Sequence, residues 1–259
     1  MTLPGGHTAR GTVPPVAPAE LLATWEAGLD RHEAGRALLL HGAARPGAGS
    51  DELLSVPVGV RETELFALRR ALFGERMQVR AECAACGEAM EFDLDAGLLA
   101  GTAAPDGPLR VEEGDWVVEF RLPNVADLTA AAAASGPEAA RRVLLERCTV
   151  SALRRGEEVT LDRPAAVLPE QVQRRLAEAA ERADPAADVT LNVACPECGE
   201  STGAELDIAS YLWTELDNWA RDVLLDVHLL ASAYGWTEPE VLALSPLRRR
   251  HYLELCADV

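Results

Sequence analysis

The chain has 259 residues, 48% of them hydrophobic, which is enough to bury a sizeable core. Its net charge of -18 disfavours nonspecific nucleic-acid binding, which depends on cationic groups that displace counterions from phosphate. We find neither a signal-peptide pattern nor an apolar run of the ~18 residues that a membrane helix needs. We therefore expect a cytoplasmic protein with reduced thiols and no membrane contact.

The N-terminal part is predicted to combine an arm with helices. Residues 1–17 are rich in Gly and Pro and lack hydrophobic periodicity, which is typical of a flexible arm. Apolar residues at helical spacing predict one helix over 18–42 and another over 62–73, with a loop over 44–50 between them. We assign 18–76 to an N-terminal helical part.

A short β-unit that contains two cysteines occurs twice. The motif Cys-x-x-Cys-Gly-Glu begins at Cys83 and again at Cys195, and short alternating segments flank both copies. The glycine after each second cysteine permits the positive φ of a tight turn. We expect a first knuckle within 77–100 and a second within 189–209.

Residues 101–188 lie between the two knuckles and are predicted to form an inserted strand with helices. Composition and periodicity divide this insert into a Gly/Pro/Asp-rich loop over 101–115, a strand over 116–122, and helices over 126–134, 138–153 and 169–182.

The C-terminal part, 210–259, is predicted to be helical. Gly235 is placed to end a long helix, and Ser245-Pro246 offers an N-cap and a first-turn proline for a final one. The long helix is indicated by seven apolar residues at intervals of three or four: Leu212, Leu216, Trp219, Val223, Val227, Leu230 and Tyr234.

The two cysteine pairs predict one structural zinc site. Zinc favours four thiolate ligands in a tetrahedron, and a two-residue gap lets one turn present both sulfurs to one ion. The predicted ligands are Cys83, Cys86, Cys195 and Cys198, and 108 residues separate the pairs. With all four positions filled by sulfur, no position is open for substrate, so the site is expected to be structural.

Three other readings of these cysteines remain open. Each pair could form a disulfide, although a reducing compartment disfavours that. One pair could be a redox motif, which needs its first cysteine near a helix N-terminus. The knuckles could also be degenerate and hold no metal. Cys148 and Cys256 lie in predicted helices and are read as core residues.

A search for catalytic motifs favours a non-enzymatic protein. The sequence contains no Gly-rich phosphate loop, no His-Glu-x-x-His motif and no nucleophile elbow. We therefore expect no catalytic residues, no small-molecule substrate and no cofactor apart from structural zinc.

Several segments resemble a known family. They are Pro57-Val58-Gly59-Val60-Arg61-Glu62, Leu212-Trp213-Thr214-Glu215-Leu216, Ala233-Tyr234-Gly235-Trp236 and Arg249-Arg250-His251-Tyr252-Leu253-Glu254-Leu255. Together they are similar to bacteriophage baseplate proteins related to the hub-assembly protein of T-even phages, which also occur in contractile injection systems. The resemblance covers roughly 18–100 and 185–256. It implies a role in assembling the baseplate hub, as a chaperone or a component of the particle, with baseplate or hub proteins as partners.

The C-terminal helices are the expected partner-binding region, because aromatic residues and arginine are enriched at binding hot spots. The arginines could instead pair with acids of their own helices, and the aromatic residues could be buried. The candidates are Trp213, Trp236, Arg248, Arg249, Arg250 and Tyr252.

Together these observations predict an α+β protein, built on a zinc-ribbon-like β-unit that is decorated by helices. Its expected function is baseplate assembly. One alternative is a zinc-ribbon nucleic-acid or protein adaptor; a nucleic-acid adaptor would need a clustered basic face. A less favoured alternative is a thiol oxidoreductase, which would need an accessible thiolate.

Overall fold

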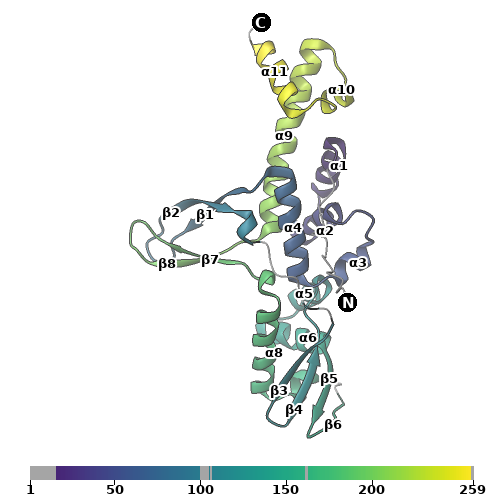
Figure 1. The fold of residues 1–259 in the computed structure, drawn as a ribbon, viewed down its shortest axis with the longest axis vertical. Coiled ribbons are helices and arrows are strands. Elements are labelled where there is room, and N and C mark those ends of the chain that lie inside the picture. The colour runs from purple at the N-terminus through teal and green to yellow at the C-terminus, as the bar shows by residue number, and fades with distance from the viewer. Residues whose placement is uncertain (1–15, 100–104, 106, 161–162, 258–259) are drawn as a thin grey trace, which may run out of the picture.

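The computed structural model describes residues 16–99, 105, 107–160 and 163–257. Figure 1 shows three parts: a helical body around one long helix, an arm of two hairpins on one side, and a small sheet with helices at one end. The predicted α+β class is confirmed, since this described part combines helices with small antiparallel sheets. The N-terminal segment 1–17, which the sequence predicted to be flexible, lies outside the described residues up to residue 15.

The helical body forms the largest core of the molecule. Leu40, Leu65, Leu212 and Leu216 are fully buried, because each lies on the apolar face of its helix. The helices of this part are α1 (Pro18–Gly28), α2 (Glu33–Ala44), α3 (Ser50–Ser55), α4 (Val58–Phe73) and α9 (Ile208–Tyr234).

The helix predicted over 18–42 is wrong as one continuous element. The chain turns after Gly28, and α2 starts at Glu33 because the His32 side chain accepts a hydrogen bond from the Gly35 N–H at 3.4 Å. The expected loop over 44–50 leads directly into α3.

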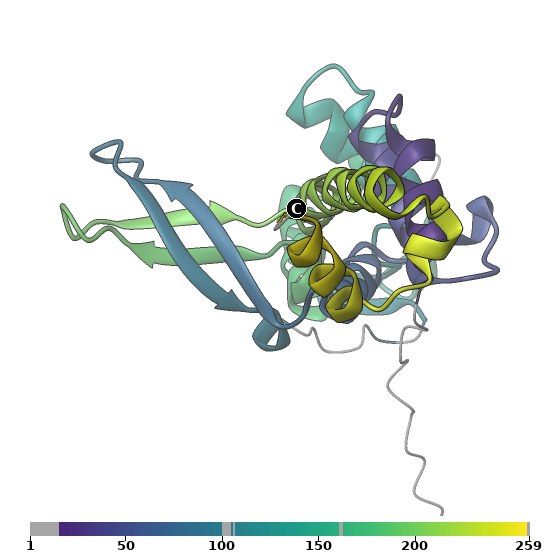
Figure 2. The same cartoon turned by 90° about the horizontal axis from the view of Figure 1, so that it is seen from above.

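The long helix α9 extends beyond the body. Its first half is packed in the core, and its far end carries α10 (Glu238–Leu242) and α11 (Pro246–Ala257) (Figure 2). Gly235 ends α9 in the left-handed conformation at φ 70°, as its position predicted.

The arm consists of two separate hairpins, β1 (Arg76–Glu82) with β2 (Ala89–Asp95), and β7 (Thr190–Ala194) with β8 (Ser201–Glu205). Both hairpins project from the same side of the body and lie next to each other (Figure 2). Each encloses a six-residue turn, because the innermost pairs are Glu82 with Ala89 and Ala194 with Ser201. Met77 is fully buried in the main core and roots the first hairpin.

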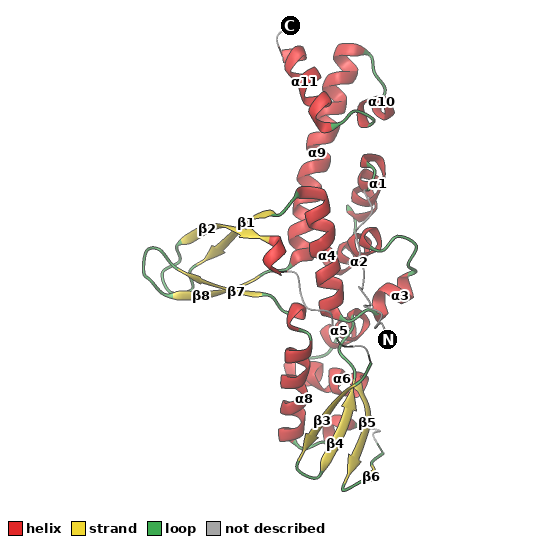
Figure 3. Cartoon of the chain, viewed as in Figure 1, coloured by secondary structure: helices red, strands yellow, loops and turns green. Residues whose placement is uncertain are grey.

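The small sheet has a core of its own, in which Trp116, Val118 and Phe120 pack against Val172 and Leu176. Figure 3 shows its strands covered by helices at one end of the molecule. The sheet is an antiparallel meander of β3 (Leu109–Glu113), β4 (Trp116–Phe120), β5 (Thr149–Arg154) and β6 (Glu157–Glu158). The helices around it are α5 (Val125–Ala132), α6 (Pro137–Cys148), α7 (Pro164–Val167) and α8 (Glu170–Ala183).

Two strands of this sheet differ from the sequence prediction. Strand β3 lies in the expected loop over 101–115, and β5 occupies the end of the helix predicted over 138–153. Both segments pair with β4, which is the strand the sequence predicted. The hydrogen bonds of β4 therefore override the local composition.

The start of α4 joins the body to the small sheet. The Val58 N–H donates to the Pro123 carbonyl at 3.0 Å, and the Gly59 N–H donates to the Asp184 carboxylate at 2.9 Å. These acceptors satisfy helix donors that have no partner within the helix. They explain why α4 begins at Val58 and not at residue 62.

Candidate metal centre

The two cysteine turns have the same backbone geometry. In the first, the Cys83 N–H donates to the Glu88 carbonyl at 2.8 Å, and the Gly87 N–H donates to the Cys83 carbonyl at 2.8 Å. In the second, Cys195 and Gly199 make the equivalent bonds at 2.8 and 2.9 Å. Gly87 and Gly199 have φ values of 75° and 74°, a region that favours glycine.

These turns bring the four predicted cysteines together. All four Sγ atoms lie within 4.8 Å of one another, and none of these cysteines forms a disulfide. The Sγ atoms of Cys83 and Cys198 are 3.7 Å apart, as are those of Cys86 and Cys195. A tetrahedral site with metal–sulfur bonds of about 2.3 Å has sulfur–sulfur edges of about 3.8 Å. The cluster can therefore hold one metal ion.

One side of the cluster is buried and the other faces solvent. Cys83 and Cys195 are 1% and 2% exposed and pack against Met90, whereas Cys86 and Cys198 are exposed. Each knuckle thus contributes one inner and one outer sulfur. This arrangement joins the tips of the two hairpins, which share no sheet hydrogen bonds.

Thr202 supports the cluster, although we did not single it out from the sequence. Its hydroxyl donates to the Cys83 Sγ at 3.7 Å and accepts from the Ala84 N–H at 3.4 Å. Thr202 occupies the position in the second β-unit that Met90 occupies in the first. The difference between threonine in one copy of the β-unit and methionine in the other was the feature of the sequence that could have identified Thr202 as a supporting residue.

The sulfurs affect one another's protonation. Hydrogen bonds from the Cys86 and Ala85 N–H groups, with the Thr202 hydroxyl, lower the pKa of Cys83 to about 6. The Glu88 N–H favours the Cys86 thiolate, but the neighbouring sulfurs outweigh it and raise the pKa of Cys86 to about 12. Four thiolates at this spacing repel one another, so a bound cation would stabilise the cluster.

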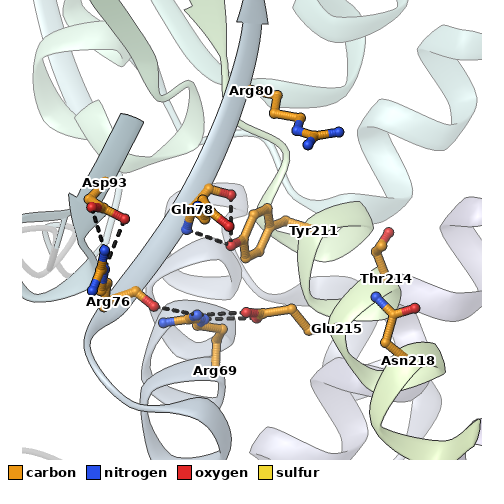
Figure 4. Close-up of a pocket in the computed structure, with 9 residues that line it drawn as sticks. All are labelled: Arg69, Arg76, Gln78, Arg80, Asp93, Tyr211, Thr214, Glu215 and Asn218. Carbon is orange, nitrogen blue, oxygen red and sulfur yellow. Dashed lines mark hydrogen bonds and ion pairs between the residues drawn. The ribbon is translucent and has the colours of Figure 1, made fainter. Parts of the chain in front are cut away.

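A polar network fixes the root of the arm beside an open hollow of about 710 Å³ (Figure 4). The buried Arg69 guanidinium donates to the Glu215 carboxylate at 2.8 and 2.6 Å and to the Arg76 carbonyl at 2.7 Å. The Tyr211 hydroxyl accepts from the Gln78 N–H at 3.0 Å and lies 3.1 Å from the Gln78 carbonyl. No sequence motif marked this network, which links α4 and α9 to β1.

The arginines that line this hollow are already paired. Arg76 binds Asp93 at 2.7 Å, and Arg80 binds Glu91 at 2.5 Å. The arginines that line the hollow are therefore all neutralised by carboxylates, and the hydrogen bonds of Arg69 and Tyr211 hold β1 against α4 and α9.

The predicted partner-binding residues occupy two kinds of position. Trp213 is buried, with the Arg36 guanidinium 4.7 Å from its ring centroid. Arg249 is also buried and pairs with Asp226 at 2.8 Å.

The other four candidates are at least partly accessible. Trp236 and Tyr252 are half-buried and meet edge to face in an aromatic cluster, while Arg248 and Arg250 are exposed.

None of the described helices is both long enough and apolar enough to cross a membrane.

Comparison with known proteins places the chain in a family. The model of the family described as T4 bacteriophage base plate protein matches residues 47–211, which is more than half of the chain. No curated protein and no solved structure matches the chain significantly. The matched segment contains α4, both hairpins and all four clustered cysteines. It ends within the first turn of α9, before most of the residues of α9 that lie in the main core. The chain therefore belongs to the T4 bacteriophage base plate protein family.

Proposed function

We propose that this chain is a non-enzymatic assembly factor or component of the baseplate hub, in a phage or a phage-derived contractile injection system. Membership of the T4 base plate family carries this proposal. Its partners are baseplate or hub proteins, and it acts in the bacterial cytoplasm, where it can be incorporated into the particle. The C-terminal helices from residue 210 onward recognise the partner.

We also propose that Cys83, Cys86, Cys195 and Cys198 bind one structural zinc ion in a zinc-ribbon-like unit. The sulfur spacing of 3.7 Å supports this assignment, and four thiolates suit zinc. Such a site is closed, so zinc acts on the fold and not on a substrate. It locks the tips of two hairpins whose cysteine pairs lie 108 residues apart in the chain.

The geometry gives less support to a thiol oxidoreductase. A redox cysteine needs an accessible sulfur and usually a helix N-terminus, whereas Cys83 and Cys195 are buried and follow strands. A nucleic-acid adaptor would need an unpaired basic surface on the arm, but Arg76 and Arg80 are paired with carboxylates.

Deletion of the gene from its own phage or injection-system cluster tests the assembly role. We expect sheathed particles with complete baseplates to disappear from electron micrographs, and a plasmid copy to restore them. Normal particles in the deletion strain would overturn the proposal. Antibody detection of the chain in purified particles distinguishes a permanent component from a chaperone that is released.

A further inference from the structure

An apolar groove of about 570 Å³ lies between α6 and α8, far from the cysteine cluster. Leu144 and Leu145 of α6 line one side, and Ala177 and Ala180 of α8 line the other. The buried Leu176 connects the groove to the core of the small sheet. The groove is open to solvent.

Both helices direct a periodic face into this groove. On α6 the lining residues include Ala140, Leu144 and Cys148, which are four positions apart, and on α8 they include Gln173 and Ala177. Residues at this spacing lie on one side of a helix. Alanine leaves space between the two helices, and Arg121 and Pro123 in the loop that follows β4 also line the groove.

The rim of the groove carries one available positive charge. Arg121 is held by Asp127, and the Gln173 amide donates to two backbone carbonyls. Arg141 is exposed and makes no ion pair with any residue that the structure describes. In a chain of net charge -18, this side chain gives the rim a local preference for an acidic group.

We propose that the α6–α8 groove binds an amphipathic α-helix of another protein, with the apolar stripe of that helix between α6 and α8 and an acidic side chain against Arg141. A third helix can seat its side chains between two helices whose faces have the same periodicity. The charge of the rim selects the acidic flank of the partner helix. This proposal uses the assembly role only to choose the partner, which is a baseplate protein of the same particle.

The probes are fluorescein-labelled synthetic peptides that cover the amphipathic, acidic helices of baseplate proteins encoded beside this chain. Binding to the full-length, metal-loaded protein is measured by fluorescence anisotropy. We expect at least one peptide to bind saturably. Ala177→Trp fills the groove from an exposed position, and Arg141→Glu reverses the rim charge, so each weakens binding about tenfold or more.

Arg174→Glu is the matched control, because Arg174 is exposed on α8 but does not line the groove. We expect Arg174→Glu to leave peptide binding unchanged. A peptide whose acidic residues are changed to Arg should bind the Arg141→Glu variant more tightly than it binds the wild-type protein. Circular dichroism confirms that each variant is folded.

Three results would overturn the proposal: no peptide binds the wild-type protein, Ala177→Trp has no effect, or Arg174→Glu weakens binding as much as Arg141→Glu. A concentration-dependent dimer that Ala177→Trp abolishes in sedimentation would assign the groove to a second copy instead. The gene-deletion experiment is independent of these measurements, so failure of the groove leaves the assembly role intact.

Discussion

The Sγ atoms of Cys83 and Cys198 lie 3.7 Å apart, although 115 positions separate them in the chain. Each sulfur belongs to a different hairpin, so this contact joins two sheets that share no ladder. The arm is therefore held together at its tip by the cysteines and at its root by the main core.

Protein purified without added metal is expected to contain about one zinc per chain, because four sulfurs at tetrahedral spacing fill its coordination sphere. Inductively coupled plasma mass spectrometry measures the metal content. Removal of the metal with a chelator should make the arm more sensitive to limited proteolysis, and added zinc should reverse this change. Iron in place of zinc, or a metal-free protein with an unchanged arm, would contradict the assignment.

Replacement of Cys195 by Ser is expected to destabilise the protein by on the order of 3 kcal/mol, since it removes a buried ligand that ties two distant segments. Thermal and chemical denaturation measure the effect. Cys256→Ser is the control, because Cys256 lies on α11 away from the cluster. Equal melting temperatures for the Cys195→Ser variant and wild type would show that the metal is dispensable for folding.

The buried Asp127 carboxylate is expected to make stability depend on acid pH. Burial alone would raise its pKa, but hydrogen bonds from Arg121, the Asn124 N–H and Arg147 outweigh burial and lower the pKa of Asp127 to about 2. A folded-state pKa below the unfolded value of ~3.9 gives stability that is present above that value and is lost as pH falls toward 2.

The wild-type protein should therefore exceed Asp127→Asn in unfolding free energy near pH 7 by about 2 kcal/mol, a difference that shrinks between pH ~4 and ~2. Urea denaturation across this range measures it. A difference that stays constant from pH 7 to pH 2 would show that the charge of Asp127 is not responsible.

Gly59→Ala is expected to weaken the junction between the body and the small sheet. A Cβ at Gly59 would lie 1.8 Å from the Asp184 Oδ1, so the carboxylate would have to leave the start of α4. Loss of such a cap costs about 1 to 2 kcal/mol. Gly42→Ala is the control, since a Cβ there meets only the Leu53 side chain, at an ordinary contact distance of 3.7 Å. Comparable melting temperatures for both variants would contradict a capping role.

The C-terminal helices are expected to bind a baseplate partner through their exposed residues. Arg249 is unsuitable for this test because it pairs with Asp226 inside the fold. Arg248→Glu with Arg250→Glu changes only exposed side chains and should weaken co-purification with the partner about tenfold or more.

A double reversal at Arg110 and Arg174, both exposed in the small-sheet part, is the control for net charge. If both double variants co-purify equally with the partner, the interface lies elsewhere on the molecule.

Local sequence was sufficient to predict the cysteine turns and the long helix. Gly87 and Gly199 adopt the positive φ that their position after Cys-x-x-Cys implied. The stripe from Leu212 to Tyr234 forms one helix that Gly235 ends. These features depend on neighbours a few residues apart, so their pattern is visible in a single sequence.

Other features depended on residues far away in the chain. Strand β5 forms because β4 supplies its hydrogen bonds, although the segment resembled the end of a helix. Trp213 is buried because its ring packs in the main core against Gly28 of α1, and Arg249 is buried where it pairs with Asp226 of α9. No spacing within their own helices indicates these contacts.

The cysteine cluster combines both kinds of information. The four cysteines and the shape of each turn could be predicted from local sequence, because a knuckle is stabilised by hydrogen bonds within six residues. The meeting of the two knuckles, the inward position of Cys83 and Cys195, and the support from Thr202 depend on tertiary contacts. These tertiary contacts form because the two hairpins pack against each other at their tips. The residues that meet there are more than 100 positions apart in the chain, so no local pattern indicates their contact.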